Sequence, residues 1–157
     1  MTSRQDGVIE MQLALIPIMM KNWQLSGIEL QKLMTKYNIL HHIDLAYEKY
    51  NSTGIKGIMA DIENYIKMLG GTVKEYRYEN KDPFVQELMD EKAKMLAGYI
   101  REKHKISWEK AILKMTGTLT YRNLLNEQSE YVYESDNFIK HKYDLEASGN
   151  MEEFLKR

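Results

Sequence analysis

The sequence contains no cysteine, which excludes disulfide bonds and zinc sites built on cysteine. It has only two prolines and nine glycines in 157 residues, so neither a disordered nor a collagen-like chain is expected. The start, MTSRQDGVIE, lacks the charged-then-apolar order of a signal peptide. The longest nearly apolar run, LALIPIMM at 13–20, is too short to span a bilayer. We therefore expect a cytoplasmic protein with no membrane segment.

A surplus of positive charge is also missing. The formal net charge is −1, and residues 1–81 carry 10 Lys and Arg against 9 Asp and Glu. Residues 82–157 carry 12 against 14. Tight binding to nucleic acid without sequence preference needs concentrated positive charge, so neither half of the chain predicts it.

Apolar residues recur at helical spacing along most of the chain, which predicts an all-α protein. Ser26 and Glu29 form a capping-box pattern at the start of a helix that Asn38 would end. Asp6 can cap an earlier helix, in which Pro17 predicts either a kink or a later beginning. The expected helices cover about 6–23, 26–37, 39–50, 55–69, 83–104, 107–115, 119–126 and 135–146, with a final turn near the C-terminus.

Two stretches alternate in the manner of strands, namely TVKEYRYE at 72–79 and EYVYE at 130–134. They could pair with each other, because a lone strand is not stable. We therefore expect a bundle of short helices in one or two tandem units of three to four helices, with a minor strand or hairpin. The expected parts are a helical unit at 1–71, a linker or strand at 72–81, and a second helical unit at 82–157 that can share one core with the first.

An offset of 81 residues aligns 14–50 with 95–131. The identical pairs are Leu15/Leu96, Ser26/Ser107, Met34/Met115, Thr35/Thr116 and Tyr50/Tyr131. Both segments also keep the order of helix, serine cap, short helix, Met-Thr and short helix. Either the chain contains a duplicated module, or two unrelated helical units share generic caps and apolar stripes.

Several polar residues could form a site. His41, Asp44 and Glu48 fall on one helical face and could bind a metal, although an ordinary ion pair explains the same spacing. Asp61 and Glu63, with Glu48, could act as paired carboxylates, and a small enzyme would use Asp61, His41 and Glu48. We favour a solvated helix face as the explanation of these residues.

No nucleophile elbow or phosphate loop of known spacing occurs, and STGIKG at 52–57 is the nearest pattern to an anion-binding turn. We therefore predict no catalytic residues, no cofactor and no metal.

Eleven tyrosines and eleven methionines are many for this length and favour a surface that binds a protein partner. The expected contact residues are exposed tyrosines, namely Tyr76, Tyr78, Tyr131 and Tyr133. The alternative is a transcriptional regulator with a helix-turn-helix-like segment near 107–126. Its polar residues suited to DNA are Thr118, Thr120, Arg122 and Asn123.

Residues 8–70 resemble a family of short helical bacterial proteins of unknown function. The matching positions are Ser26, Glu29, Lys36, Tyr37, Ile39, Leu40, Ile43, Tyr47, Gly54, Asp61, Ile62, Tyr65 and Ile66. Pro17 departs from the uninterrupted first helix of that family. The C-terminal half is similar to a second small helical protein of the same gene neighbourhoods, which often include proteins that resemble ADP-ribosyltransferase toxins. The resemblance implies an accessory or antitoxin-like partner and no catalytic residues.

Overall fold

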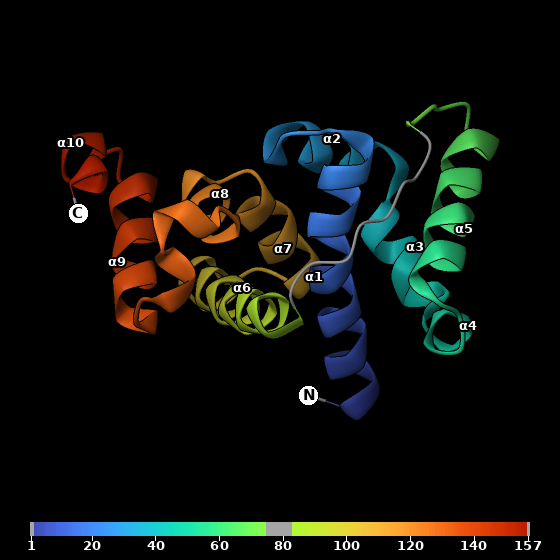
Figure 1. Cartoon of the computed structure of the whole chain (residues 1–157), viewed down its shortest axis with the longest axis horizontal. Coiled ribbons are helices and arrows are strands. Elements are labelled where there is room, and N and C mark those ends of the chain that lie inside the picture. The colour runs from blue at the N-terminus through green and yellow to red at the C-terminus, as the bar shows by residue number, and fades with distance from the viewer. Residues whose placement is uncertain (1, 75–82, 157) are drawn as a thin grey trace. The chain divides into compact units, whose positions relative to one another are not determined.

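The computed structural model describes residues 2–74 and 83–156 (Figure 1). The chain divides into two compact units, Met1–Asn80 and Lys81–Arg157. All regular structure in the described residues is helical, which confirms the all-α prediction. The boundary between the units lies at the end of segment 72–81, to which we assigned a linker or strand.

The described residues of the first unit, 2–74, form five helices. They are α1 (Ser3–Trp23), α2 (Gly27–Tyr37), α3 (Ile39–Leu45), α4 (Tyr47–Asn51) and α5 (Ile55–Met68). Helix α1 packs against α2 and α3, and α3 packs against α2 and α4. Large apolar side chains such as Trp23, Leu30 and Ile62 are at most 2% exposed and form the core. Their burial supplies the main free energy that holds these short helices together.

The second unit is also helical. Its elements are α6 (Pro83–His104), α7 (Trp108–Thr116), α8 (Leu119–Leu125), the 3₁₀ helices η1 (Glu127–Ser129) and η2 (Tyr131–Tyr133), α9 (Asp136–Ala147) and α10 (Met151–Leu155). Helix α6 packs against α7, α8 and α9, and α10 packs against α9.

The predicted cap of α2 is confirmed, whereas the predicted cap of α1 is wrong. The Ser26 and Glu29 capping box is present, and Asn38 ends α2 with a left-handed backbone of φ 54°. The first helix begins at Ser3, where Thr2 provides the cap, so the prediction of Asp6 as the cap is wrong. The Thr2 hydroxyl accepts a hydrogen bond from Gln5 N at 3.1 Å, which satisfies a free N–H of the first turn. The helix continues through Pro17.

The expected helix 39–50 is divided in two. Ala46, at φ −94° and ψ 5°, ends α3 and precedes α4. This break lets α4 turn, so that Tyr50 is buried at 1% exposure.

The predicted strand at 130–134 is wrong, because this segment forms the 3₁₀ helix η2. Glu130 has a left-handed backbone of φ 64°, and Tyr133 N donates to its carbonyl at 3.0 Å. Adjacent residues Tyr131 and Val132 are both buried, at 6% and 1% exposure, which an alternating strand with one buried face would not give. Residues 72–74 are not a strand, and the rest of the predicted strand 72–79 lies outside the described residues.

Two pairs of corresponding helices begin 81 residues apart. This spacing separates the starts of α2 and α7, Gly27 and Trp108, and the starts of α5 and α9, Ile55 and Asp136. Gln24 and Lys105 share a left-handed backbone, at φ 53° and 54°. In each unit, the backbone N–H of the residue after this left-handed position donates to the carbonyl of the residue five positions before the donor, at 2.9 and 3.2 Å. This agreement favours the duplication that the sequence left open, and it extends the match through α5 and α9.

Candidate functional site

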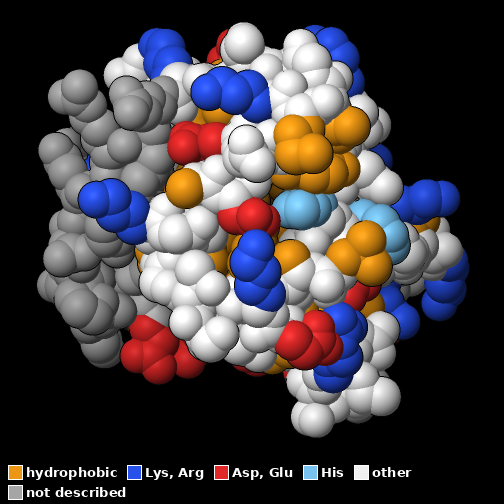
Figure 2. Space-filling model, turned by 90° about the vertical axis from the view of Figure 1, so that its right-hand side faces the viewer, with side chains coloured by type: hydrophobic (Ala, Val, Ile, Leu, Met, Phe, Trp, Pro, Cys, Tyr) orange, Lys and Arg blue, Asp and Glu red, His pale blue; other side chains and the backbone are white. Residues whose placement is uncertain are grey.

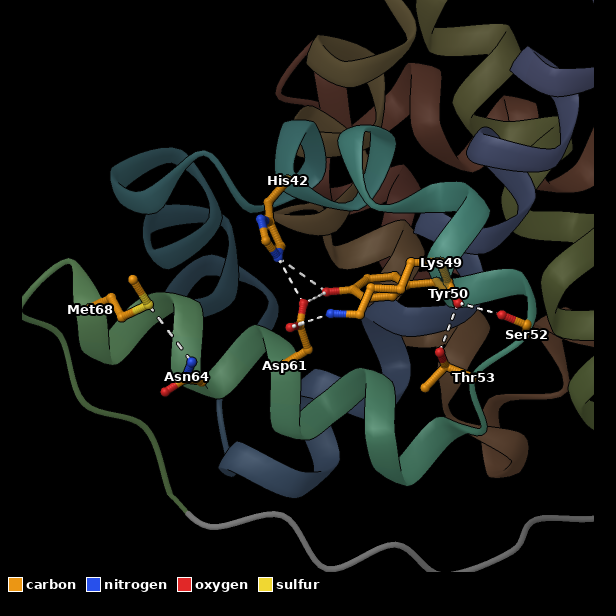
Figure 3. A network of polar contacts seen from close by, with 8 residues as sticks. All are labelled: His42, Lys49, Tyr50, Ser52, Thr53, Asp61, Asn64 and Met68. Atoms are coloured by element: carbon orange, nitrogen blue, oxygen red, sulfur yellow. Dashed lines mark hydrogen bonds and ion pairs between the residues drawn. The ribbon is translucent and has the colours of Figure 1, made fainter.

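Asp61 is the centre of a polar network in the first unit (Figure 3). The Tyr50 hydroxyl on α4 donates to Asp61 Oδ2 at 2.5 Å, and His42 Nε2 on α3 lies 3.2 Å from the same oxygen. Lys49 Nζ lies 3.3 Å from Asp61 Oδ1. His42 Nε2 is also 3.1 Å from the Tyr50 hydroxyl. The network therefore ties together α3, α4 and α5.

The ring of His42 is held in place by its neighbours. It stacks on Tyr65 of α5, with ring centroids 3.9 Å apart and an interplanar angle of 18°. The Tyr65 hydroxyl in turn donates to the carbonyl of Tyr37 at 2.6 Å. A stacked ring with a fixed nitrogen loses little further freedom when it bonds Asp61, so the network is preorganised.

The network also fixes the charge of its members. Burial raises the pKa of Asp61, but hydrogen bonds from Tyr50, His42 and Lys49 outweigh burial and bring the pKa below its ordinary value. Burial, followed by the contact with Asp61, raises the pKa of Tyr50. At neutral pH the carboxylate is ionised and the phenol is neutral, so neither group is matched to general acid–base catalysis near pH 7.

The equivalent positions in the second unit carry different chemistry. His42, Tyr50 and Asp61 correspond at 81 residues to Asn123, Tyr131 and Lys142, and these three line a groove of about 370 Å³. The same groove is lined by the C-terminal residues Phe154, Leu155 and Lys156. Lys142 Nζ, in a residue only 4% exposed, donates to the carbonyls of Phe154, at 2.7 Å, and Lys156.

Large apolar side chains are exposed on the two helices that carry His42 and Asp61. Leu45, at the end of α3, is 70% exposed, while Met68 and Leu69, at the end of α5, are 78% and 53% exposed. Figure 2 shows the face that carries α5, where hydrophobic side chains adjoin histidines among acidic and basic groups. Exposed apolar side chains with a polar surround are typical of protein-binding surfaces.

Other polar residues that the sequence singled out have partners within the first unit. Arg4 binds both Asp44, at 2.8 Å, and Glu48, at 2.6 Å, a pairing between helices that differs from the i, i+3 ion pair expected within one helix. The Arg4 hydrogen bond lowers the pKa of Glu48. Asp61 is joined to His42, whereas the enzyme hypothesis paired it with His41 and Glu48.

Two further sequence candidates are also engaged in the first unit. The Glu63 carboxylate accepts a hydrogen bond from Trp23 Nε1 at 3.0 Å. In segment 52–57, the Ser52 and Thr53 hydroxyls donate to the carbonyl of Lys49 (Figure 3).

The tyrosines expected to contact a partner have different environments. Tyr133 is 60% exposed, as expected. Tyr131 is only 6% exposed and packs edge-on against Phe138 at 5.2 Å, so the expectation that it is exposed is wrong. Tyr76 and Tyr78 lie outside the described residues.

The residues expected to contact DNA are partly used by the fold. Thr118 caps α8, and Thr120 is fully buried and donates its hydroxyl to Glu146 at 2.8 Å. The Glu146 carboxylate also accepts the backbone N–H groups of α8 at residues 119 and 120. Arg122 is exposed and Asn123 is half-buried. A carboxylate at the start of α8 takes the place that a DNA phosphate would need, so Thr118 and Thr120 are unavailable to DNA in this arrangement.

Comparison with protein-family models, curated proteins and solved structures found no match to this chain. Among the described residues, none of the helices combines the length and apolar character needed to cross a membrane.

Sequence reasoning missed the joint placement of His42, Tyr50 and Asp61, and it did not single out Lys142. His42, Tyr50 and Asp61 lie on three different helices, and each is an ordinary residue on its own helix. The offset of 81 residues, carried past Tyr50 and Tyr131 to Asp61 and Lys142, would have drawn attention to them.

Proposed function

We propose that this chain is a non-catalytic protein-interaction module. The observation that carries the proposal is the exposure of Leu45, Met68 and Leu69 beside a preorganised polar network. Exposing such side chains to water costs free energy that a partner would recover by covering them. The lowered pKa of Asp61 and the raised pKa of Tyr50 favour a supporting role for the network over acid–base chemistry.

The resemblance of residues 8–70 adds a specific partner to the proposal. It favours an antitoxin-like or accessory role in the bacterial cytoplasm, directed at a protein similar to ADP-ribosyltransferases. In this role the chain would bind the partner through surface shape and would contribute no catalytic group.

Co-expression with the proteins encoded by neighbouring genes tests the proposal. We expect one of them to co-elute with the chain in size-exclusion chromatography at a fixed ratio. If that protein arrests growth when expressed alone, co-expression should relieve the arrest. The proposal would be contradicted if the chain elutes alone after co-expression with each neighbouring gene product and retains no protein from its host.

A DNA-binding regulator remains the second proposal, with Arg122 as its available basic residue. Its weakness is the Glu146 carboxylate at the start of α8. A gel shift with the upstream DNA at two salt concentrations distinguishes the two functions, because phosphate contacts make binding strongly salt-dependent. No shift at low salt would eliminate the regulator.

A further inference from the structure

In the second unit, the site equivalent to the Asp61 network is covered by the C-terminal segment of the chain. Phe154 of α10 is 3% exposed, and the Lys142 ammonium lies 5.6 Å from the ring centroids of both Phe138 and Phe154. Lys142 also donates to two carbonyls at the C-terminal end of α10. A cation at the carbonyl end of a helix is favoured by the helix dipole. The second unit thus shows how a short helix docks at this position: a buried aromatic ring beside a charged anchor.

In the first unit, residues 70–74, which correspond to 151–155 of the second, take a different path. After α5 the chain turns at Gly70, which has φ 90°. A Cβ on Gly71 would come within 2.4 Å of the Tyr37 hydroxyl, so this glycine packs directly against α2. Lys74 Nζ then donates to the side chain of Gln24 at the end of α1. Residues 70–74 therefore pack against α1 and α2 and do not repeat the docking of α10.

Three residues at the ends of α3 and α5 differ in apolar character from their equivalents in the second unit. Leu45, Met68 and Leu69 of the first unit correspond to Asn126, Gly149 and Asn150 of the second. The three apolar residues are all more than half exposed. Asn126, Gly149 and Asn150 are also exposed, so the two units differ at these positions in apolar character and not in coverage.

The charged residue at this position also has the opposite sign in the two units. Asp61 replaces Lys142, and Lys49 replaces Glu130. A carboxylate accepts hydrogen bonds and attracts cations, so the complementary group is a lysine or arginine side chain. The contact of Asp61 Oδ1 with Lys49 is 3.3 Å long and the Lys49 side chain is 68% exposed, so an incoming cation would compete with a solvated lysine for this oxygen.

We propose that Leu45, Asp61, Met68 and Leu69 form a docking surface for a short amphipathic segment of a partner protein. The segment presents a lysine or arginine to Asp61 and covers the three exposed apolar side chains with its own apolar residues. The inference rests on the proposed interaction function and names the site and chemistry of the partner.

A library of short random peptides displayed on phage, selected on the immobilised full chain, tests this surface. We expect the enriched peptides to share a lysine or arginine flanked by apolar residues. Binding of a synthetic peptide, measured by fluorescence anisotropy, should weaken at least about tenfold in Leu45→Ser and in Met68→Ser. Leu155→Ser in the second unit is the matched control, since Leu155 is 78% exposed like Met68. It should leave affinity unchanged.

Replacing the basic residue of the peptide with methionine, and Asp61 with asparagine, tests the anchor. Each change alone should weaken peptide binding. The two changes together should weaken it little more than either change alone. Peptides that bind equally well to the Leu45 and Met68 variants, or the absence of any enriched peptide, would overturn the surface. Co-elution with a neighbouring gene product would still support the interaction function in that case. Enriched peptides without a basic residue would overturn the Asp61 anchor.

Discussion

Tyr50→Phe should destabilise the first unit by removing the Tyr50 hydroxyl, with its bond to Asp61 and its contact with His42, while the ring stays in place. The ring of Tyr50 is 1% exposed, and phenylalanine fills the same space. The lost bond, 2.5 Å from hydroxyl to Asp61 Oδ2, has an ionised acceptor. Hydrogen bonds to charged groups contribute about 1.5–3 kcal/mol, and the Asp61 side chain is 30% exposed, so the lower part of that range applies. We expect the free energy of unfolding to fall by about 1.5–2 kcal/mol at pH 7.

The two tryptophans allow each unit to be followed separately. Trp23 lies in the first unit, where Nε1 donates to Glu63 of α5, and Trp108 lies in the second. Urea unfolding followed by Trp23 fluorescence in a Trp108→Phe background therefore reports the first unit. A loss of this size should lower the unfolding midpoint by on the order of 1 M urea. Tyr131→Phe, at the equivalent position of the second unit, is the control and should leave the Trp23 midpoint unchanged.

The effect of Tyr50→Phe should depend on pH. The pKa of Asp61 is lower in the folded chain than its unfolded value of about 3.9. The stabilisation by Asp61 is therefore complete above the unfolded pKa and is lost as pH falls through the folded pKa. The difference between wild type and Tyr50→Phe should be largest near pH 7 and shrink below about pH 4. A difference under about 0.5 kcal/mol at pH 7, or one that does not change with pH, would refute the role given to this bond.

Three further changes test other parts of the structure. Ser26→Ala removes the cap of α2 and should cost about 1 kcal/mol in the unfolding of the first unit, whereas Ser26→Thr should cost much less. Lys142→Met removes the anchor of the C-terminal segment, and hydrogen exchange at residues 151–156 should become faster while α6 stays protected. Glu146→Gln weakens the bonds to the start of α8 and should lower the stability of the second unit by about 1–2 kcal/mol, as read by Trp108 fluorescence.

Helix starts and the fold class were accessible from sequence because their causes are local. Ser26 and Glu29 bond each other within one helical turn, and Ser107 caps α7 in the same manner. Apolar spacing depends only on the helical period, so the all-α class follows from it. Thr2 and Asp6 show the limit of such reasoning, because either could cap the first helix and only the path of the chain selects Thr2.

The environment of individual residues was less accessible. The pattern at 130–134 resembled a strand, yet the left-handed backbone at Glu130 and the burial of both Tyr131 and Val132 depend on tertiary packing. The exposure of Tyr131 was mispredicted for the same reason. The polar network could not be predicted from the sequence either, because His42, Tyr50 and Asp61 lie on three helices whose packing brings them together.

The pair Asp61 and Lys142 indicates why one scaffold position can carry opposite charges. Around Asp61 the neighbours are donors, the Tyr50 hydroxyl and the side chains of His42 and Lys49. Around Lys142 the neighbours are backbone carbonyls, which only accept. A lysine at 61 would face donors and an aspartate at 142 would face acceptors, so either single exchange would leave a buried or half-buried charge without its bonds. The sign of the charge at this position is therefore fixed by its neighbours, which are donors around Asp61 and acceptors around Lys142.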